Sequence, residues 1–280
     1  MSDWLSGEVV TNGIRMHYHR TGGDKPALVL SHGATDNGLC WTRVARVLEA
    51  DYDVVMPDAR GHGQSSAPDS GYSSADHAAD LAGLIRALGL QRPALGGHSM
   101  GAGTTLRLIA DEPDLASCAV LEDPGLRLPN AAPLRGQADP RTSIRQVVLD
   151  AQSSDLETTI RRGREASPLW GDDEWQPWAQ AKQQLSRQFV DTLGSGPMPQ
   201  DWQELLGRVR CPVLLVTSDP ERGGIVTPEA AQVAARVLPS LEVVRLPGAG
   251  HNIRREQFDG FVSAVRGFLA AHYPTTTPAS

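Results

Sequence analysis

The sequence predicts an α/β fold: a mostly parallel, twisted β-sheet with helices on both faces and an inserted helical cap. Three observations predict it. The 280 residues suffice for one large domain with a sizeable core. Short apolar segments alternate with segments of helical periodicity, and residues 125–205 interrupt that alternation. Strand and helix in alternation are typical of a parallel sheet that is buried on both faces.

The apolar segments are short and bounded by Gly, Pro, Asp or Ser, which is the pattern of buried strands. They are residues 27–30, 54–56, 93–95, 118–121, 213–216 and 243–246. Between several of them, apolar residues return at every third or fourth position, which predicts amphipathic helices. These helical segments are residues 75–88, 101–110, 229–237 and 258–271.

Residues 125–205 contain no convincing strand pattern and several helical ones. We therefore predict a core formed by residues 1–124 and 206–272, with residues 125–205 as its helical cap. Residues 273–280 are rich in Thr and Pro and are predicted to form a flexible tail. Tryptophans in the cap either pack the helical layer onto its neighbour or line a pocket. They are Trp170, Trp175, Trp178 and Trp202.

Composition excludes several classes of partner. The formal net charge of −7 produces a field that repels polyanions, so no nucleic-acid partner is expected. No apolar run approaches the ~20 residues that span a bilayer, and the N-terminal residues lack the pattern of a secretory signal. We expect a cytoplasmic protein, monomeric or homodimeric, that acts on a small-molecule substrate without a membrane partner.

The cysteines and two alternating histidines carry no metal signal. Cys40, Cys118 and Cys211 are odd in number and widely spaced, which predicts buried thiols and neither a disulfide framework nor a zinc cluster. His17 and His19 alternate along a strand pattern with no carboxylate or cysteine nearby, which favours a structural role. We therefore expect no metal and no cofactor.

The strongest chemical signal is the pentapeptide GHSMG at residues 97–101. It lies between a strand pattern and a helix pattern, the context of a nucleophile elbow. The serine in such a turn has a strained backbone, and glycines beside it let strand and helix approach closely. The turn also stands at the carboxyl end of a buried strand, where open α/β sheets bind ligands. Ser99 is therefore the candidate nucleophile.

A serine hydroxyl needs a base within hydrogen-bond reach. His251 ends the run GAGH, after the last predicted strand and before the last predicted helix. This position places it on a loop at the same edge of the sheet as Ser99, and the glycines let the loop turn the imidazole inward. His251 is therefore the candidate general base, whereas His62 and His98 are interpreted as neighbours of a turn and of the elbow.

An anionic tetrahedral intermediate needs two backbone N–H donors. Met100, at the start of the predicted helix, supplies one candidate amide. Ala34, which follows the strand ALVLS and the pair His32 and Gly33, supplies the other. We expect His32 to brace that loop.

These motifs resemble the α/β-hydrolase superfamily, in particular its cap-bearing esterases, lactonases and amidohydrolases. The matching features are His32-Gly33, the segment DARGHGQS at residues 58–65, the elbow at Ser99 and the run PGAGH that ends at His251, in the family's order. The resemblance spans nearly the whole chain. It implies an α/β-hydrolase fold and a catalytic triad, with residues 58–65 as a structural turn near the pocket.

The acid of the triad is left open. In the commonest family pattern it follows the strand before the histidine, where this chain has Asp219 and, in the expected slot, Glu221. In a family variant it follows the strand after the elbow helix, 24 residues beyond the nucleophile, which here is Asp123. Glu122 beside it is a further alternative. We take Asp123 as the candidate acid and Asp219 as the main alternative.

The resemblance implies an acyl-enzyme formed on Ser99 and hydrolysed by water. We expect a small carboxylic ester or a lactone as substrate, since alcohol leaving groups demand the least acid catalysis. The alternatives are cleavage of an amide or of a carbon–carbon bond, formation of peracids without a cofactor, and a ligand sensor that keeps the hydrolase fold.

Overall fold

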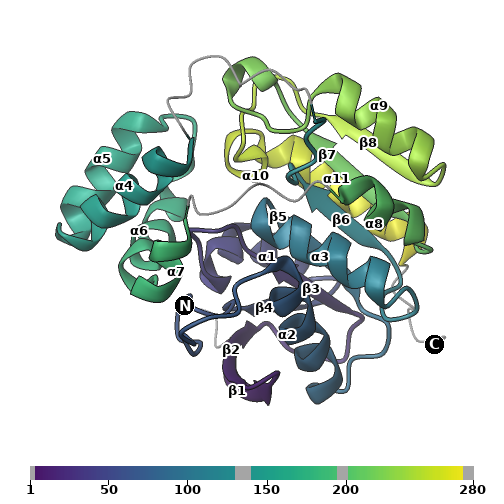
Figure 1. Cartoon of the computed structure of the whole chain (residues 1–280), viewed down its shortest axis with the longest axis horizontal. Coiled ribbons are helices and arrows are strands. Elements are labelled where there is room, and N and C mark those ends of the chain that lie inside the picture. The colour runs from purple at the N-terminus through teal and green to yellow at the C-terminus, as the bar shows by residue number, and fades with distance from the viewer. Residues whose placement is uncertain (1–3, 130–139, 194–200, 274–280) are drawn as a thin grey trace.

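The computed structural model describes residues 4–129, 140–193 and 201–273, with the backbone alone at residues 140–143 (Figure 1). The predicted tail, apart from Tyr273, lies outside the described residues. An eight-stranded sheet of order β1-β2-β4-β3-β5-β6-β7-β8 runs through the molecule. Its strands are β1 (Leu5–Thr11), β2 (Ile14–Arg20), β3 (Ala27–Ser31), β4 (Asp53–Pro57), β5 (Ala94–His98), β6 (Ala119–Glu122), β7 (Val213–Thr217) and β8 (Leu241–Arg245).

Strands β1 and β2 are antiparallel to their neighbours, and β4, β3, β5, β6, β7 and β8 are parallel to one another. The parallel strands are the six predicted from apolar segments, although β8 begins two residues before the predicted segment. The hairpin β1–β2 was not among those segments. Its edge strand β1 alternates between exposed and half-buried positions and so lacks a continuous apolar run.

Each face of the sheet packs against its own helices, because successive strand residues point to opposite faces. Leu95 and Leu215 belong to the apolar cluster on one face of the sheet, whereas Leu214 and Val216 belong to the cluster on the other face. The first face carries α2 (Ser74–Ala87), α3 (Met100–Asp111), α8 (Trp202–Arg208) and α9 (Pro228–Val237), and the second carries α1 (Thr42–Leu48), α10 (Ile253–Glu256) and α11 (Phe258–His272). The predicted α/β class is confirmed.

A helical insertion lies beside the sheet between β6 and α8 (Figure 1). It contains α4 (Pro140–Gln152), α5 (Leu156–Ala166), α6 (Trp175–Gln184) and α7 (Arg187–Thr192). The insertion also contains the short 3₁₀ turn η2 (Asp172–Glu174), and two further 3₁₀ turns lie outside it, η1 (Gly38–Trp41) and η3 (Pro220–Arg222). Helix α8 crosses the predicted cap boundary at residue 205, and its Trp202 is buried in the core cluster of the sheet. The boundaries of the cap stay a prediction.

Both readings of the tryptophans find support. Trp170, Trp175 and Trp178 pack together, with ring centroids 5.0–6.0 Å apart. Trp170 and Trp178 also line a cavity, and Trp202 lines another. Over the described residues, no helix is both long and apolar enough to cross a membrane.

Candidate active site

The elbow between β5 and α3 holds Ser99 in a backbone conformation that L-residues rarely adopt, with φ 52° and ψ −111°. Its amide donates to the carbonyl of Glu122 over 3.0 Å, which fixes the turn against β6. A Cβ at Gly97 would lie 2.3 Å from the carbonyl oxygen of Gly101, and one at Gly101 would lie 2.2 Å from that of Ser31. Both glycines are therefore required by the close approach of helix and strand.

The structure brings His251 and Asp123 together. Nδ1 of His251 lies 2.7 Å from Oδ2 of Asp123, whose side chain is fully buried. The same carboxylate accepts the backbone N–H groups of Ile225 and Val226 over 2.9 and 3.0 Å. Asp123 itself follows β6 with a positive φ of 42°. The two backbone N–H groups therefore set the position of the carboxylate, and the carboxylate in turn sets the position of the imidazole.

This arrangement changes the basicity of the imidazole. Burial lowers the pKa of His251, but the hydrogen bond to Asp123 and the negative charges of Asp123 and Glu122 outweigh burial and raise the pKa above its ordinary value. The His251 side chain is 29% exposed, and together with Ser99 it lines a cavity. A base of this kind can accept a proton from a group in that cavity.

The other carboxylates considered as the acid have different partners. Asp219 binds the guanidinium of Arg245 and the amide of Gly248, each over 2.7 Å. Glu122 is buried against Arg254, and Glu221 is exposed. The structure therefore places Asp123, and not Asp219, against the candidate base.

The loop that carries Ala34 is braced by histidines. His32 donates from Nδ1 to the carbonyl of Gly33 and accepts the amide of Ala59 at Nε2, so it braces the loop as predicted. Nε2 of His62 lies 2.9 Å from the carbonyl oxygen of Ala34 itself. The turn at residues 58–65 therefore supports the loop that carries Ala34.

Met100, the first residue of α3, has an N–H that no earlier turn of the helix can use. Met100 and Ala34 line the same cavity as Ser99. The two predicted amide donors therefore belong to residues that lie beside Ser99 at this cavity.

A cluster of buried ionic side chains next to the site was missed by the sequence reasoning. Asp36 accepts from three cations: Lys182 over 3.2 Å, Arg254 over 3.0 Å and Arg255 over 3.1 Å. Burial alone would raise the pKa of Asp36, but these cations hold it well below its ordinary value. Arg254 also binds Glu122, and Arg255 binds Glu174. We call these six side chains the ionic cluster: Asp36, Glu122, Glu174, Lys182, Arg254 and Arg255.

The ionic cluster connects the insertion to the site. Lys182 of α6 donates from Nζ to the carbonyl of Thr35 over 2.9 Å, one residue after Ala34. Arg254 and Arg255 are the second and third residues of α10, which begins at Ile253 two residues after His251. The Arg-Arg pair behind the histidine was a visible signal, but its partners lie far away in sequence.

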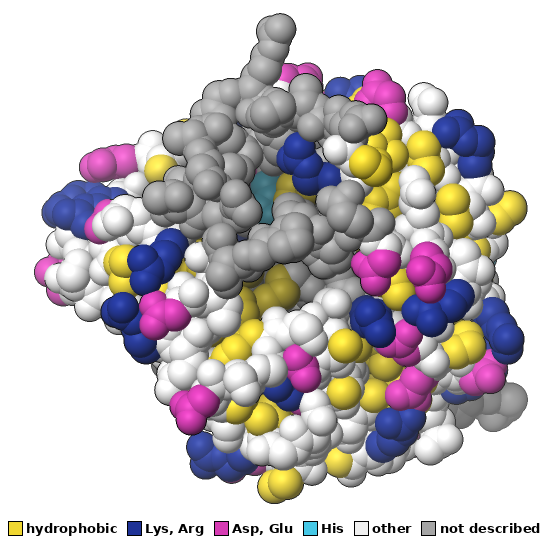
Figure 2. Space-filling view, viewed as in Figure 1, with side chains coloured by type: hydrophobic (Ala, Val, Ile, Leu, Met, Phe, Trp, Pro, Cys, Tyr) yellow, Lys and Arg dark blue, Asp and Glu magenta, His cyan; other side chains and the backbone are white. Residues whose placement is uncertain are grey.

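Two cavities meet at Ser99 and Ala34. The larger, about 350 Å³, extends along α3 and includes Met100 and Gly103. The smaller, about 200 Å³, includes His251 and Lys182. In the space-filling view, a hollow opens on this face of the molecule and a histidine side chain is visible within it (Figure 2). Ser99 therefore borders open space on two sides.

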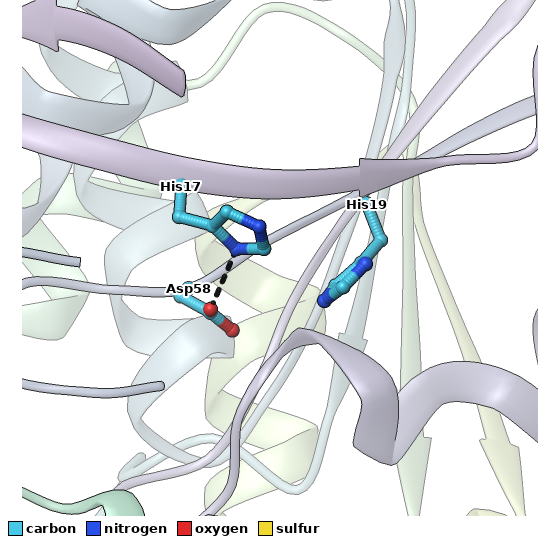
Figure 3. Close-up of side chains that lie close together, drawn as sticks. All are labelled: His17, His19 and Asp58. Carbon is cyan, nitrogen blue, oxygen red and sulfur yellow. Dashed lines mark hydrogen bonds and ion pairs between the residues drawn. The ribbon is translucent and has the colours of Figure 1, made fainter. Parts of the chain in front are cut away.

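His17 and His19 have a carboxylate neighbour after all, contrary to the sequence expectation, because the end of β4 brings Asp58 beside them (Figure 3). Their ligand-type atoms lie within 4.8 Å of one another. Nδ1 of His17 donates to Asp58 over 2.9 Å, and its Nε2 bonds Ser6. Asp58 also accepts two backbone amides. These bonds support a structural role for His17 and Asp58.

The buried thiols are poor nucleophiles. Burial raises the pKa of Cys40 and of Cys118 to about 12, and that of Cys211 to about 11. All three cysteines are free and buried, as predicted.

Comparison with known proteins places these features in context. The model of the alpha/beta hydrolase family matches residues 28–264. N-formylmaleamate deformylase of Pseudomonas putida is 32% identical over 275 residues, covering 96% of this chain and 98% of that protein. 2-(Acetamidomethylene)succinate hydrolase of Mesorhizobium japonicum is 25% identical over 254 residues, covering 90% and 91%. The crystal structure of N-formylmaleamic acid deformylase from Pseudomonas putida S16 has a TM-score of 0.81 at 26% identity, covering 93% of this chain and all of that one (100%).

Proposed function

The chain belongs to the alpha/beta hydrolase family, and on that premise we propose that it is a serine hydrolase that cleaves a small carboxylic amide. Ser99 is the nucleophile, His251 the general base and Asp123 the acid that orients it. The amides of Ala34 and Met100 form the oxyanion hole.

One observation carries this proposal: the 2.7 Å contact between Nδ1 of His251 and Asp123, at the cavity that Ser99 lines. A carboxylate on Nδ1 holds the imidazole in the tautomer whose Nε2 can accept a proton. It also stabilises the imidazolium that forms when the serine attacks.

The proposed reaction has two halves. His251 takes the proton of Ser99 as its Oγ attacks the substrate carbonyl, and the two backbone amides bind the resulting oxyanion. His251 then donates this proton to the leaving nitrogen, the C–N bond breaks, and the amine departs. Water, deprotonated by His251, hydrolyses the acyl-enzyme and releases the carboxylic acid.

The bond type rests on the relatives. Both curated relatives are named for hydrolysis of an N-formyl or acetamido compound, which favours the amide alternative over the ester or lactone expected from the sequence. An amine must be protonated as it leaves, and a raised His251 pKa suits an acid that donates this proton. Esters form the same acyl-enzyme with less demand on the acid, so we expect them to be accepted as well.

The test compares an anilide and a p-nitrophenyl ester of the same acyl group in steady-state assays of wild type and Ser99→Ala. Ser218→Ala is the matched control, since Ser218 is a buried serine that directly follows β7 in the same sheet. We expect turnover of both substrates by wild type and by the control, and its loss in Ser99→Ala.

Turnover that persists in Ser99→Ala contradicts the serine mechanism. Ester turnover without amide turnover contradicts the amide assignment and restores the ester expectation. A single covalent event at Ser99 without steady turnover supports the ligand sensor instead.

A further inference from the structure

We infer, on the basis of the proposed function, that the two cavities divide the substrate between them. The larger cavity receives an apolar acyl chain, the smaller cavity receives a polar leaving group, and Gly103 on α3 sets the length of acyl chain that is accepted.

The position of His251 assigns the sides. Ser99 and Ala34 line both cavities, so the scissile carbonyl lies where the cavities meet. His251 lines the smaller cavity and does not line the larger one among the described residues. Because His251 donates its proton to the leaving atom, the leaving group extends into the smaller cavity. The acyl chain is left with the larger one.

The larger cavity has the chemistry of an acyl site. Its volume of about 350 Å³ falls in the range of small-ligand pockets. Its described lining is mostly apolar and includes Leu106, Leu126, Phe189, Leu193, Leu205 and Ile225. Among the described lining residues, Asp201 alone carries a formal charge at neutral pH, since burial lowers the pKa of His77 to about 4. The Asp201 side chain is 45% exposed, which allows its charge to stay hydrated. The lining thus offers many contacts to an apolar chain and few partners to a charged one.

The smaller cavity, about 200 Å³, differs in its lining. Asp36, Lys182 and Arg255 of the ionic cluster line it, and so does Asn252. Of the three cluster residues that line it, Lys182 and Arg255 are basic and Asp36 is acidic. Together with Asn252 they bring hydrogen-bond donors and acceptors to this side of Ser99. A polar leaving group fits it.

The packing of α3 does not require a glycine at position 103. Gly103 lies inside the helix, where glycine is less favourable than alanine. A Cβ at Gly97 or Gly101 would clash with the backbone, whereas a Cβ at Gly103 would meet no atom within 4 Å. Gly103 lines the larger cavity. A side chain at this position would therefore project into space that the acyl chain needs.

The test uses two isomeric esters, ethyl hexanoate and hexyl acetate, which differ only in the side of the carbonyl that carries the long chain. We compare kcat/KM by titration of released acid for wild type, Gly103→Leu and Gly103→Ala. Each methylene buried in an apolar site raises kcat/KM up to about fourfold. We expect wild type to prefer ethyl hexanoate by at least about tenfold, Gly103→Ala to retain that order, and Gly103→Leu to lower kcat/KM for ethyl hexanoate far more than for hexyl acetate.

The control is Gly267→Leu. Gly267 is also a glycine inside a helix, α11, where an added Cβ meets nothing within 4 Å, but it is exposed and lines neither cavity. We expect Gly267→Leu to leave the ratio of the two esters unchanged. A preference for hexyl acetate in wild type, or an equal loss on both esters in Gly103→Leu, overturns the inference.

A binding measurement separates this inference from the proposed function. Calorimetry with hexanamide and acetamide on Ser99→Ala protein needs no turnover. Stronger binding of hexanamide that Gly103→Leu removes supports the acyl cavity even if no substrate is turned over, in which case the proposed function alone fails. Equal binding of both amides, or binding that Gly103→Leu does not change, contradicts the cavity assignment even if hydrolysis is observed.

Discussion

The sheet edge and the helical insertion both reach the candidate site, but different interactions hold them there. At the sheet edge, backbone groups position the chemistry: the amides of Ile225 and Val226 bind Asp123, and the glycines of the elbow let α3 approach β3. On the insertion side, the buried ammonium of Lys182 donates to the carbonyl of Thr35, in the loop that carries Ala34. The backbone groups that bind Asp123 are placed by the pairing of the strands, whereas the contact between the insertion and Thr35 depends on the side chain of Lys182 alone.

One part of the site is therefore held by backbone hydrogen bonds of the core, and the other depends on a side chain of the insertion. Buried ion pairs are weak sources of net stability, because desolvation offsets their attraction, but removing one partner is costly. The ionic cluster is therefore best understood as a device that holds the insertion in a defined place. The following predictions probe each side in turn.

The largest effect is expected at the sheet edge. Asp123→Asn leaves the fold in place but removes the carboxylate that sets the tautomer of His251, so kcat/KM should fall by about 10⁴-fold. Asp219→Asn is the matched variant, because Asp219 binds Arg245 and Gly248 instead, and it should cost less than tenfold. Steady-state kinetics of the two folded variants check this. A larger loss in Asp219→Asn would assign the orienting role to that residue.

A smaller effect is expected from the insertion side. Lys182→Met removes the donor to Thr35 and one partner of Asp36, so we expect a loss of about 3 kcal/mol in unfolding free energy. The same change should lower kcat by up to about 10²-fold, because the loop that carries Ala34, the proposed oxyanion donor, loses a support.

Chemical denaturation and kinetics measure both effects of Lys182→Met. Lys25→Met is the control, since Lys25 is the other lysine of the chain and is exposed. If Lys182→Met lowers stability and leaves kcat intact, the ammonium anchors the insertion without positioning the loop.

Acidification is expected to destabilise a second contact between the core and the insertion, that between His77 and Phe189. His77 of α2 packs against Phe189 of α7 with ring centroids 6.3 Å apart, and burial lowers its pKa to about 4. Between about pH 6.5 and pH 4 the unfolded chain binds a proton there that the folded protein does not. The stability present above pH 6.5 is therefore lost on acidification, by about 2 kcal/mol at pH 5.

Denaturant titrations at several pH values check this loss, with His77→Leu expected to remove about 2 kcal/mol of the loss at pH 5. His62, whose pKa burial lowers to about 3, should keep its own contribution in that variant. An identical pH dependence in wild type and His77→Leu would exclude His77 as its source.

The smallest effect concerns the pH profile at the sheet edge. The neutral form of His251 is the base and its pKa is raised, so kcat/KM should decline as pH falls, with a midpoint above 6.5. Asp123→Asn removes the hydrogen bond and charge that raise the pKa and should move the midpoint to lower pH. Profiles measured with a neutral substrate check the shift, with Asp219→Asn expected to keep the wild-type midpoint.

Much of the fold could be predicted because its signals are local. Apolar runs located the six parallel strands, and the helical periods of residues 75–88 and 258–271 located α2 and α11. The edge strand β1 and the short α1 carry weaker signals, since one is half-exposed and the other has seven residues. The elbow at Ser99 was visible for the same local reason, because its motif GHSMG is contiguous in the sequence.

The α/β class and the candidates Ser99 and His251 follow from the sequence alone, because each depends on residues that are neighbours along the chain. Only the tertiary structure decided which carboxylate lies against His251, since Asp123 and Asp219 both follow strands at the same sheet edge and only packing orients their side chains. It likewise decided the partners of Asp36, which come from Lys182, Arg254 and Arg255. Charges that pair across such separations leave no periodic pattern, because their attraction depends on distance in space and not on spacing along the chain.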